Sequence, residues 1–273
     1  MASYAGVVIA RDFPYFDQPF IPLAHRGGSL LGGNLGRENT LHAFANAVSL
    51  GYRYLETDVH ATADGHLVAF HDDVLDRVTD ATGAIRELPL AGVREARIAG
   101  IDQVPTLDEV FEHFPEQRIN IDIKAPGAIE PLVAAIDAHR AHDRVCVGSF
   151  TPSSLERFRR LSGGQVPTSV GPRGIAWTGL VPMLPRLLAS PGVAFQMPVD
   201  HVVGGRRVRL LTPWLLDSAH RRGKVVHVWT INDSEQMHQL IDLGVDGLVT
   251  DAIDVLKGVL LERGLWHGGE QTN

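Results

Sequence analysis

Two stretches of apolar sequence carry charged residues at every second position. The sequence LETDV contains Glu56 and Asp58, and the sequence INIDIK contains Asp122 and Lys124. Side chains of a β-strand alternate between its two faces, so each pair shares one face of its strand. Three carboxylates that converge with open positions suit a hard divalent cation such as Mg²⁺ or Ca²⁺. Lys124 alone could balance them as a structural ion-pair cluster, but we favour a metal site held by Glu56, Asp58 and Asp122.

Two histidines close apolar runs in the same part of the chain. His25 ends the run before Arg26 and two glycines, and His71 ends the sequence LVAFH. Phosphodiester cleavage needs one group to remove a proton from the nucleophile and another to protonate the leaving alkoxide, which two histidines beside carboxylates can supply. The planar guanidinium of Arg26 can bind two phosphate oxygens. Its alternative role is that of a surface arginine closing a turn.

These residues must be positioned by a regular alternation of strands and helices. Apolar runs predict eight strands, at 21–25, 53–59, 118–123, 144–149, 166–170, 193–198, 224–230 and 246–250. Helical patterns fall between them, at 40–50, 106–114, 128–140, 152–161, 180–188, 213–222, 234–243 and 253–263. Alternating strands and helices require parallel pairing, and eight such units favour a closed TIM (β/α)₈ barrel over an open sheet. His25, His71 and the carboxylates then lie at the carboxyl ends of strands, where barrel enzymes have their active sites.

One insertion interrupts the alternation after the second strand. Asp64 and Gly65 are a hairpin signal, which predicts an extra short strand at 67–70. Residues 72–105 then form an irregular insertion on the catalytic side of the barrel. We expect this insertion to form a wall of the substrate site.

The ordered set of short motifs resembles the glycerophosphodiester phosphodiesterases. The resemblance covers residues 21–256 and rests on His25-Arg26-Gly27, Glu38-Asn39-Thr40, Glu56-x-Asp58, Asp64-Gly65, His71-Asp72, Pro105-Thr106-Leu107, Asp122-Ile123-Lys124 and Val228-Trp229-Thr230-Ile231-Asn232. Several of these pieces are weak alone, but their order and spacing are specific to the family.

The resemblance implies a barrel with a small insertion after strand two and hydrolysis of a small-molecule glycerophosphodiester to glycerol 3-phosphate and an alcohol. It implies that Glu56, Asp58 and Asp122 hold the metal, that His25 and His71 form the acid–base pair, and that Arg26 and Lys124 contact the phosphate. Trp229 would line the pocket beside the alcohol. Phe150, after the fourth strand, could pack in the core or against the substrate, and we place it at the substrate.

Two positions depart from the family pattern. Arg37 stands where the family usually has proline, which weakens the argument for a rigid backbone in that loop. Asp122 stands where the family usually has glutamate. Aspartate is one methylene shorter, so a cation must shift or a water must bridge the gap.

Two other functions use the same residues. A reaction like that of the sphingomyelinase D or lysophospholipase D enzymes would form a cyclic phosphate within the substrate. A non-catalytic protein that binds phosphoryl ligands could retain the barrel and most of the site. Turnover and binding assays distinguish these alternatives.

Composition limits the remaining possibilities. The 273 residues carry a formal charge of −7, and the thinly spread Lys and Arg residues form no basic stripe, which argues against a nucleic-acid partner. One cysteine, Cys146, excludes an intramolecular disulfide. We find neither a secretory signal nor an apolar run of membrane-spanning length, and we expect a single cytoplasmic domain over residues 1–273. The sequence leaves the oligomeric state open.

Overall fold

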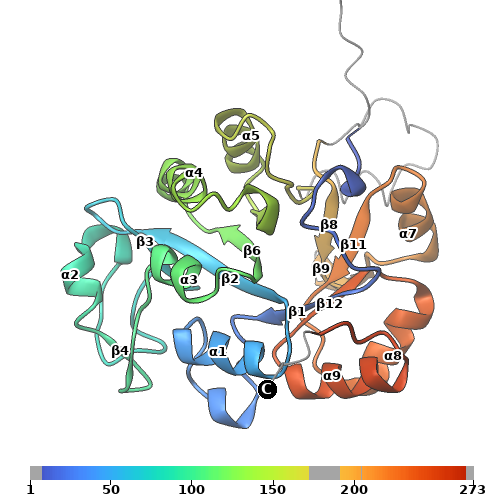
Figure 1. Cartoon of the computed structure of the whole chain (residues 1–273), viewed down its shortest axis with the longest axis horizontal. Helices are drawn as coiled ribbons and strands as arrows, with labels where there is room; N and C mark the ends of the chain where they lie inside the picture. Colours follow the sequence, from blue (N-terminus) through green and yellow to red (C-terminus); the bar gives the residue numbers. More distant parts are fainter. Residues whose placement is uncertain (1–7, 172–190, 204, 269–273) are drawn as a thin grey trace, which may run out of the picture.

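A parallel β-barrel surrounded by helices forms the centre of the computed structural model, which describes residues 8–171, 191–203 and 205–268 (Figure 1). Seven parallel strands pair in the order β7-β6-β2-β1-β12-β11-β8. Their bounds are Ile21–His25 (β1), Tyr54–Ala61 (β2), Arg118–Ile123 (β6), Val145–Gly148 (β7), Ala194–Met197 (β8), Val225–Val228 (β11) and Gly247–Thr250 (β12).

An eighth segment closes the barrel between β7 and β8. Thr168 pairs with Val147 and Ser169 pairs with Ala194, both in parallel. This closing segment lies within the strand predicted at 166–170. The expected TIM barrel is therefore confirmed. Its eighth strand position is filled by a segment that makes two isolated β-bridges.

Helices predicted between the strands are present wherever the structure describes the chain. They are α1 (Leu41–Ser49), α3 (Leu107–His113), α4 (Ile129–Ala138), α5 (Pro152–Leu161), α7 (Pro213–His220), α8 (Ser234–Leu243) and α9 (Ile253–Glu262). Short 3₁₀ helices occur at Ala10–Asp12 (η1), Gly32–Asn34 (η2), Ile85–Glu87 (η3), Pro126–Ala128 (η4) and His142–Arg144 (η5). The helix predicted at 180–188 lies outside the described residues.

Side-chain caps explain where several helices begin and end. The hydroxyl of Thr40 accepts a hydrogen bond from the first turn of α1. Thr106 and Glu109 form a reciprocal capping box at the start of α3. The last turn of α8 ends at Gly244, whose φ of 94° lies in the left-handed region that glycine adopts without strain.

The insertion after β2 folds around a small core of its own. Strand β3 (Leu67–Ala69) runs antiparallel to β2, as the Asp-Gly signal predicts. The insertion then contains η3, helix α2 (Leu90–Val93) and the antiparallel strands β4 (Arg97–Ile98) and β5 (Asp102–Gln103). Its core consists of Val68, Phe70, Leu75, Ile85, Val93, Ala96, Ile98 and Val104. Figure 1 shows α2 and β4 at one side of the barrel.

The interior of the barrel is apolar at one end and charged at the other. At the amino-terminal end, Tyr15 is fully buried in a cluster with Leu23, Tyr54, Cys146 and other side chains. The hydroxyl of Tyr54 donates to the carbonyl of Tyr15 at 2.7 Å, so the segment before β1 closes this end. Arg118 and Asp17 form an ion pair beside Tyr54 at the rim of this closed end, whereas Glu56, Asp58 and Asp122 lie further toward the carboxyl ends of the strands.

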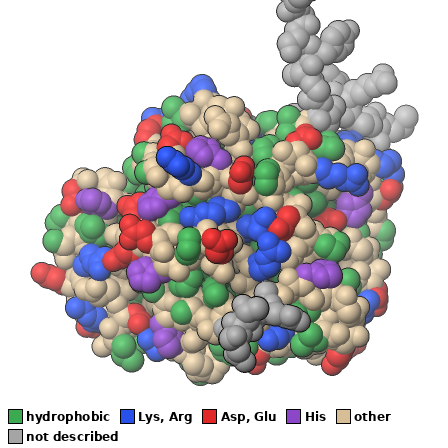
Figure 2. Space-filling model, viewed as in Figure 1, with side chains coloured by type: hydrophobic (Ala, Val, Ile, Leu, Met, Phe, Trp, Pro, Cys, Tyr) green, Lys and Arg blue, Asp and Glu red, His purple; other side chains and the backbone are tan. Residues whose placement is uncertain are grey.

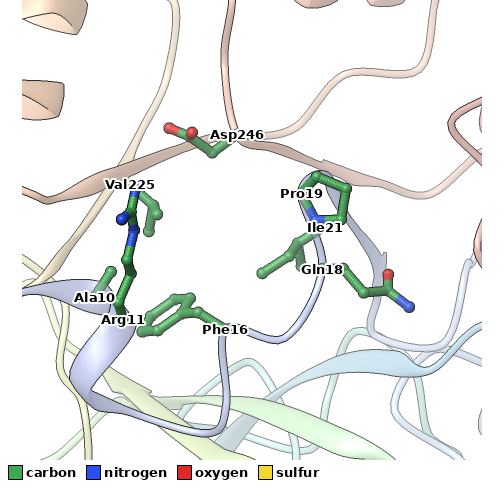
Figure 3. Close-up of a pocket in the computed structure, with 8 residues that line it drawn as sticks. All are labelled: Ala10, Arg11, Phe16, Gln18, Pro19, Ile21, Val225 and Asp246. Atoms are coloured by element: carbon green, nitrogen blue, oxygen red, sulfur yellow. The ribbon is translucent and has the colours of Figure 1, made fainter.

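A cavity of about 270 Å³ lies at the closed end, away from the charged residues. Its lining comes from the segment before β1 and from the starts of β1, β11 and β12, as Figure 3 shows: Ala10, Arg11, Phe16, Gln18, Pro19, Ile21, Val225 and Asp246. Gln18 points away from it and donates to the carbonyl of His267 at 3.1 Å. The cavity is at the wrong end of the barrel to hold a substrate of the charged site.

The structure shows how the basic side chains are distributed on one face and how long the apolar helices are. On the face seen in Figure 2, Lys and Arg side chains are interspersed with Asp, Glu and His. That face therefore presents no continuous basic surface. Within the described part of the chain, no helix combines the length and apolar character that crossing a bilayer requires.

Candidate active site

Strand pairing brings the predicted residues together at the carboxyl ends of neighbouring strands. His25 at the end of β1 pairs in register with Glu56 of β2. Asp58, two residues further along β2, pairs with Asp122 of β6. All three carboxyl residues are buried, although barrel interiors are usually filled by apolar side chains. Burying charges in this way requires compensation by other charged groups.

Lys124 lies between two of the three carboxylates. Its Nζ is 2.8 Å from Oδ1 of Asp58 and 3.0 Å from Oδ2 of Asp122. Burial lowers the pKa of Lys124, but the two aspartates outweigh burial and raise it. Burial raises the pKa of Asp122 to about 6 despite the ammonium group. Lys124, Asp58 and Asp122 therefore form the ion-pair cluster that the sequence offered as the alternative to a metal site.

Glu56 has the least charge compensation of the three carboxylates. Among the described residues it forms an ion pair only with His25, whose Nε2 is 3.8 Å from Oε2. The backbone N–H of Arg26 donates to the same oxygen at 3.2 Å. Burial and the neighbouring Asp58 raise the pKa of Glu56 to about 7. A further positive charge beside Glu56 would favour its ionised form.

A carboxylate from the end of the last strand orients His25. Oδ1 of Asp251 accepts from Nδ1 of His25 at 2.7 Å and from the hydroxyl of Ser29 at 2.9 Å. The side-chain amide of Asn232 donates to the other oxygen at 3.2 Å. Burial raises the pKa of Asp251, but these hydrogen bonds lower it below its usual value. Since an ionised carboxylate only accepts, Nδ1 of His25 carries a proton and Nε2 is left for chemistry.

Burial and the nearby carboxylates act in opposite directions on His25. Burial lowers its pKa, while Glu56 and Asp251 raise it. The carboxylates outweigh burial, so the pKa of His25 is raised. The protonated ring is therefore stabilised at this position.

A second carboxylate orients His71 in the same way. Oδ1 of Asp72 accepts from Nδ1 of His71 at 2.6 Å. Arg77 of the insertion holds Asp72 from the other side, with Nε 2.5 Å from Oδ2. Partial burial raises the pKa of Asp72, but the hydrogen bonds from Arg77 and His71 lower it to about 2. The carbonyl of His71 also accepts from the ring of the buried His60 at 3.1 Å, so His60 supports the backbone of His71.

Arg26 has a buried Nε–H that forms no hydrogen bond among the described residues, although a carboxylate lies close to it. Its Nη1 donates to Oε1 of Glu38 at 3.0 Å, and its Nε lies 3.2 Å from Oδ2 of Asp58. The Nε–H has no hydrogen-bond partner among the described residues. Its φ of 51° lies in the left-handed region, which is unusual for a residue with a side chain and is often found at functional sites. An anion within reach of Nε would satisfy this donor.

Arg37 joins its loop to the insertion. Its Nε and Nη2 donate to the two carboxylate oxygens of Asp102, at 2.5 and 2.7 Å. This two-point ion pair restrains the position at which the family usually has proline. The loss of proline is therefore accompanied by a side-chain contact to β5.

The ring of Phe150 lies beside Lys124 and packs on a second aromatic ring, that of Trp229. Phe150, after β7, packs edge-to-face on Trp229 with 5.7 Å between ring centroids. Nζ of Lys124 lies 5.7 Å from the centroid of the Phe150 ring. Phe150 is 60% exposed, so it does not belong to the core. An apolar part of a ligand could cover this ring.

The donor types fit a divalent cation better than their arrangement does. Glu56, Asp58 and Asp122 offer only carboxylate oxygens, which hard cations prefer. Three further carboxylates surround the site, those of Glu38, Asp72 and Asp251. The side chains of Arg26, Arg77 and Lys124 balance part of this negative charge. Within the described residues, however, no three acidic or histidine side chains are grouped at metal-binding spacing. Lys124 occupies the position between two of the proposed ligands.

The sequence patterns assigned no role to five residues of this site, one of which is Asp72, quoted only as the neighbour of His71 in a motif. Asp251 directly follows a predicted strand, as His71 does, and His25 is the last residue of one, so that position was a usable signal. Asn232 belongs to a recognised motif but carried no assigned role. Glu38 and Arg77 meet only through loop geometry, which periodicity does not reveal.

Comparison with known proteins places this geometry in context. The sequence model of the glycerophosphoryl diester phosphodiesterase family matches residues 25–255. A Mycobacterium tuberculosis protein named "Probable glycerophosphodiester phosphodiesterase 2" is 38% identical over 256 residues, covering 91% of this chain and 93% of its own. A glycerophosphodiester phosphodiesterase of Caldanaerobacter subterraneus is 30% identical, with 89% and 98% covered.

Solved structures share the fold. A Silicibacter pomeroyi structure named "Putative glycerophosphoryl diester phosphodiesterase" superposes with a TM-score of 0.76 at 24% identity, over 93% of this chain and 99% of the other. An Oleispira antarctica phosphodiesterase, solved in complex with the product sn-glycerol-3-phosphate, gives a TM-score of 0.74 at 23% identity, with 90% and 98% covered. These likenesses support the barrel.

Proposed function

The chain belongs to the glycerophosphoryl diester phosphodiesterase family, and we propose that it hydrolyses glycerophosphodiesters to glycerol 3-phosphate and an alcohol through His25 and His71. Family membership establishes the phosphodiesterase activity. The roles of individual residues and of a cation are the proposal. The Oleispira relative, solved with sn-glycerol-3-phosphate, supports the proposed product.

The observation that carries the proposal is the matched setting of the two histidines. Each ring is held through Nδ1 by an aspartate, at 2.7 Å for His25 and 2.6 Å for His71. This leaves Nε2 of both rings free to exchange a proton. One histidine removes a proton from the nucleophile, and the other protonates the departing alcohol. The nucleophile is water or the neighbouring glycerol hydroxyl, and the second route passes through a cyclic phosphate.

Two cationic side chains would bind the phosphate. The unsatisfied Nε–H of Arg26 offers a charge-assisted hydrogen bond to a non-bridging oxygen. Lys124 supplies a second positive charge, which helps to stabilise the charge that develops in the transition state. Trp229 would contact the alcohol, and Phe150, which packs on Trp229, would contact an apolar part of the substrate.

A divalent cation, Mg²⁺ or Ca²⁺, would be held by Glu56, Asp58 and Asp122. Its place is supported by the surplus of carboxylates and by Glu56, whose ion pairing among the described residues is limited to His25. When bound, such a cation neutralises charge on the phosphate. With the cation bound, Asp58 and Asp122 would interact less with Lys124, whose ammonium group would be available to the substrate.

Product identification by ³¹P NMR tests the proposed reaction. Glycerophosphocholine is incubated with the purified chain and a divalent cation, and the phosphorus resonances are followed with time. We expect glycerol 3-phosphate as the final product. Phosphocholine as the only product would show cleavage of the other ester bond and would contradict the proposal.

Lysophospholipids are a second substrate class. Lysophospholipase D proteins of rat and human, both 28% identical, align over 87% of this chain. The exposed Phe150 offers an apolar surface for a chain attached to the glycerol. Lysophosphatidylcholine in the same assay would give lysophosphatidic acid if this class is accepted, and no change if it is not.

A further inference from the structure

Ion pairs link the proposed phosphate-binding arginine to a proposed acid–base histidine without a break. Arg26 contacts Glu38, Glu38 contacts Arg77, Arg77 contacts Asp72, and Asp72 contacts His71. The first two residues lie in the loop after β1, and the last three in the segment after β3. The side chain of Arg77 joins the two segments, because it contacts Glu38 of the first and Asp72 of the second.

The guanidinium group of Arg77 donates hydrogen bonds to the carboxylates of both Glu38 and Asp72. Its Nη1 and Nη2 donate to the two oxygens of Glu38, at 3.0 and 2.7 Å. Its Nε and Nη2 donate to the two oxygens of Asp72, at 2.5 and 3.2 Å. This planar fork fixes the orientation of each carboxylate as well as its charge.

Each carboxylate uses an oxygen held by Arg77 to hold a residue of the site. Oε1 of Glu38 also accepts from Nη1 of Arg26, and Oδ1 of Asp72 also accepts from Nδ1 of His71. Glu38 and Asp72 are largely buried, with side chains 14% and 19% exposed. Without the guanidinium between them, two buried anions would lose their shared cation and could move toward solvent.

The backbone that carries Arg77 is attached to the core of the insertion. Leu75 is buried in that core, and its N–H donates to the carbonyl of Gly83 at 3.0 Å. The hydroxyl of Thr79 donates to the carbonyl of Leu75 at 2.8 Å, which closes the turn around Arg77. The insertion thus presents Arg77 to the site from a fixed support.

We propose that Arg77 is a positioning residue, which sets the ring of His71 through Asp72 and the guanidinium of Arg26 through Glu38. This inference rests on the proposed function, because it gives His71 and Arg26 their roles in the reaction. The insertion would then do more than form a wall of the site. It would supply the guanidinium group of Arg77, which aligns residues on two sides of the site. Arg77 itself need not touch the substrate.

The kinetic test compares Arg77→Ala and Arg77→Lys with the unmodified enzyme. We expect Arg77→Ala to lower kcat by about 10- to 100-fold, since small displacements of catalytic groups have effects of this size. KM should change less than kcat. Lysine can contact either carboxylate but cannot bridge both with a planar fork, so Arg77→Lys should be intermediate. Added guanidinium ion should restore part of the kcat of Arg77→Ala.

Arg94→Ala is the matched control. Arg94 also extends from the insertion to a carboxylate, with Nη1 2.7 Å from both oxygens of Glu109 at the start of α3. The substitution removes an ion pair that supports the insertion. This ion pair is not part of the series of contacts that joins Arg26 to His71. We expect near-normal kcat. An equal fall in kcat for Arg94→Ala and Arg77→Ala would overturn the proposal, because the effect would then be general support of the insertion.

A second readout avoids activity altogether. The Nδ1 resonance of His71 in ¹⁵N-labelled protein reports its hydrogen bond to Asp72, with neither substrate nor cation present. We expect this resonance to shift in Arg77→Ala, to shift less in Arg77→Lys, and to stay unchanged in Arg94→Ala. An unchanged resonance together with normal kcat in Arg77→Ala would reject the positioning role. Failure of the unmodified protein to hydrolyse any phosphodiester would instead reject the proposed function, and the resonance would still test the alignment of His71.

Discussion

Oδ1 of Asp251 lies 2.7 Å from Nδ1 of His25, although 226 positions separate the two residues in sequence. The last barrel strand thereby orients a residue at the end of the first, across the neighbouring pair β1 and β12. This contact selects the tautomer that leaves Nε2 of His25 for proton transfer.

Asp251→Asn should lower kcat strongly, because an amide can stabilise the wrong tautomer and lacks the negative charge. We expect a loss of about 10²- to 10⁴-fold, the range in which proton-transfer catalysis contributes. Ser29→Ala is the control, since it removes one hydrogen bond to Asp251 and leaves the contact with His25 intact. Steady-state kinetics that show equal losses in both variants would refute the orienting role.

His25→Ala and His71→Ala should each reduce turnover by about 10²- to 10⁴-fold or more while the barrel remains folded. Both side chains lie at strand ends rather than in the apolar clusters, so their loss leaves the core intact. Circular dichroism checks the fold, and release of glycerol 3-phosphate measures activity. Substantial activity in either variant would remove that histidine from the acid–base pair.

Removal of divalent cations should abolish activity, and Mg²⁺ or Ca²⁺ should restore it. The carboxylates of Glu56, Asp58 and Asp122 would then have lost the ion that balances their charge. Glu56→Gln should raise the cation concentration needed for half-maximal activity. Full activity after exhaustive chelation would end the metal proposal.

The stability of the protein should fall in acid partly because of His227. This side chain is fully buried, both ring nitrogens lack a hydrogen-bond partner among the described residues, and burial lowers its pKa to about 4. The unfolded chain, with an ordinary histidine pKa near 6.5, binds the proton more readily than the folded chain. The resulting stability is therefore present above about pH 6.5 and is lost as the pH falls through 4.

His227→Leu isolates this effect from groups that titrate in the opposite sense. Glu56 has a raised pKa of about 7, so its contribution to stability grows as the pH falls. The difference between the two proteins cancels such terms when the sites are independent. Between pH 7 and pH 5, the unmodified protein should lose roughly 2 kcal/mol more free energy of unfolding than the variant. Denaturant titrations with the same pH dependence for both would contradict this.

Local sequence patterns predicted the barrel because each strand is short, apolar and separated from the next by a helical pattern. β1 and β6 begin and end at the predicted residues, and β2 differs by one residue at its start and two at its end. The parity of β2 and β6 also placed Glu56, Asp58 and Asp122 inward, since alternation is a property of the strand itself.

The local sequence patterns could not predict side-chain contacts between separate strands and loops. The position of Lys124 between Asp58 and Asp122 depends on side-chain conformation. The bridge that Arg77 makes from Asp72 to Glu38 depends on how the insertion folds. Arg37 shows the same dependence, because its partner Asp102 follows it by 65 residues. Periodicity specifies the face of an element, whereas these contacts depend on side-chain conformation or on the relative placement of two loops.

The most direct measurement is the turnover of glycerophosphocholine by the purified chain, with and without Mg²⁺ or Ca²⁺. We predict cation-dependent release of glycerol 3-phosphate and choline, lost in both His25→Ala and His71→Ala. No product across several head groups and both metals, with the ligand still bound, would contradict hydrolysis and indicate a phosphoryl-binding protein instead.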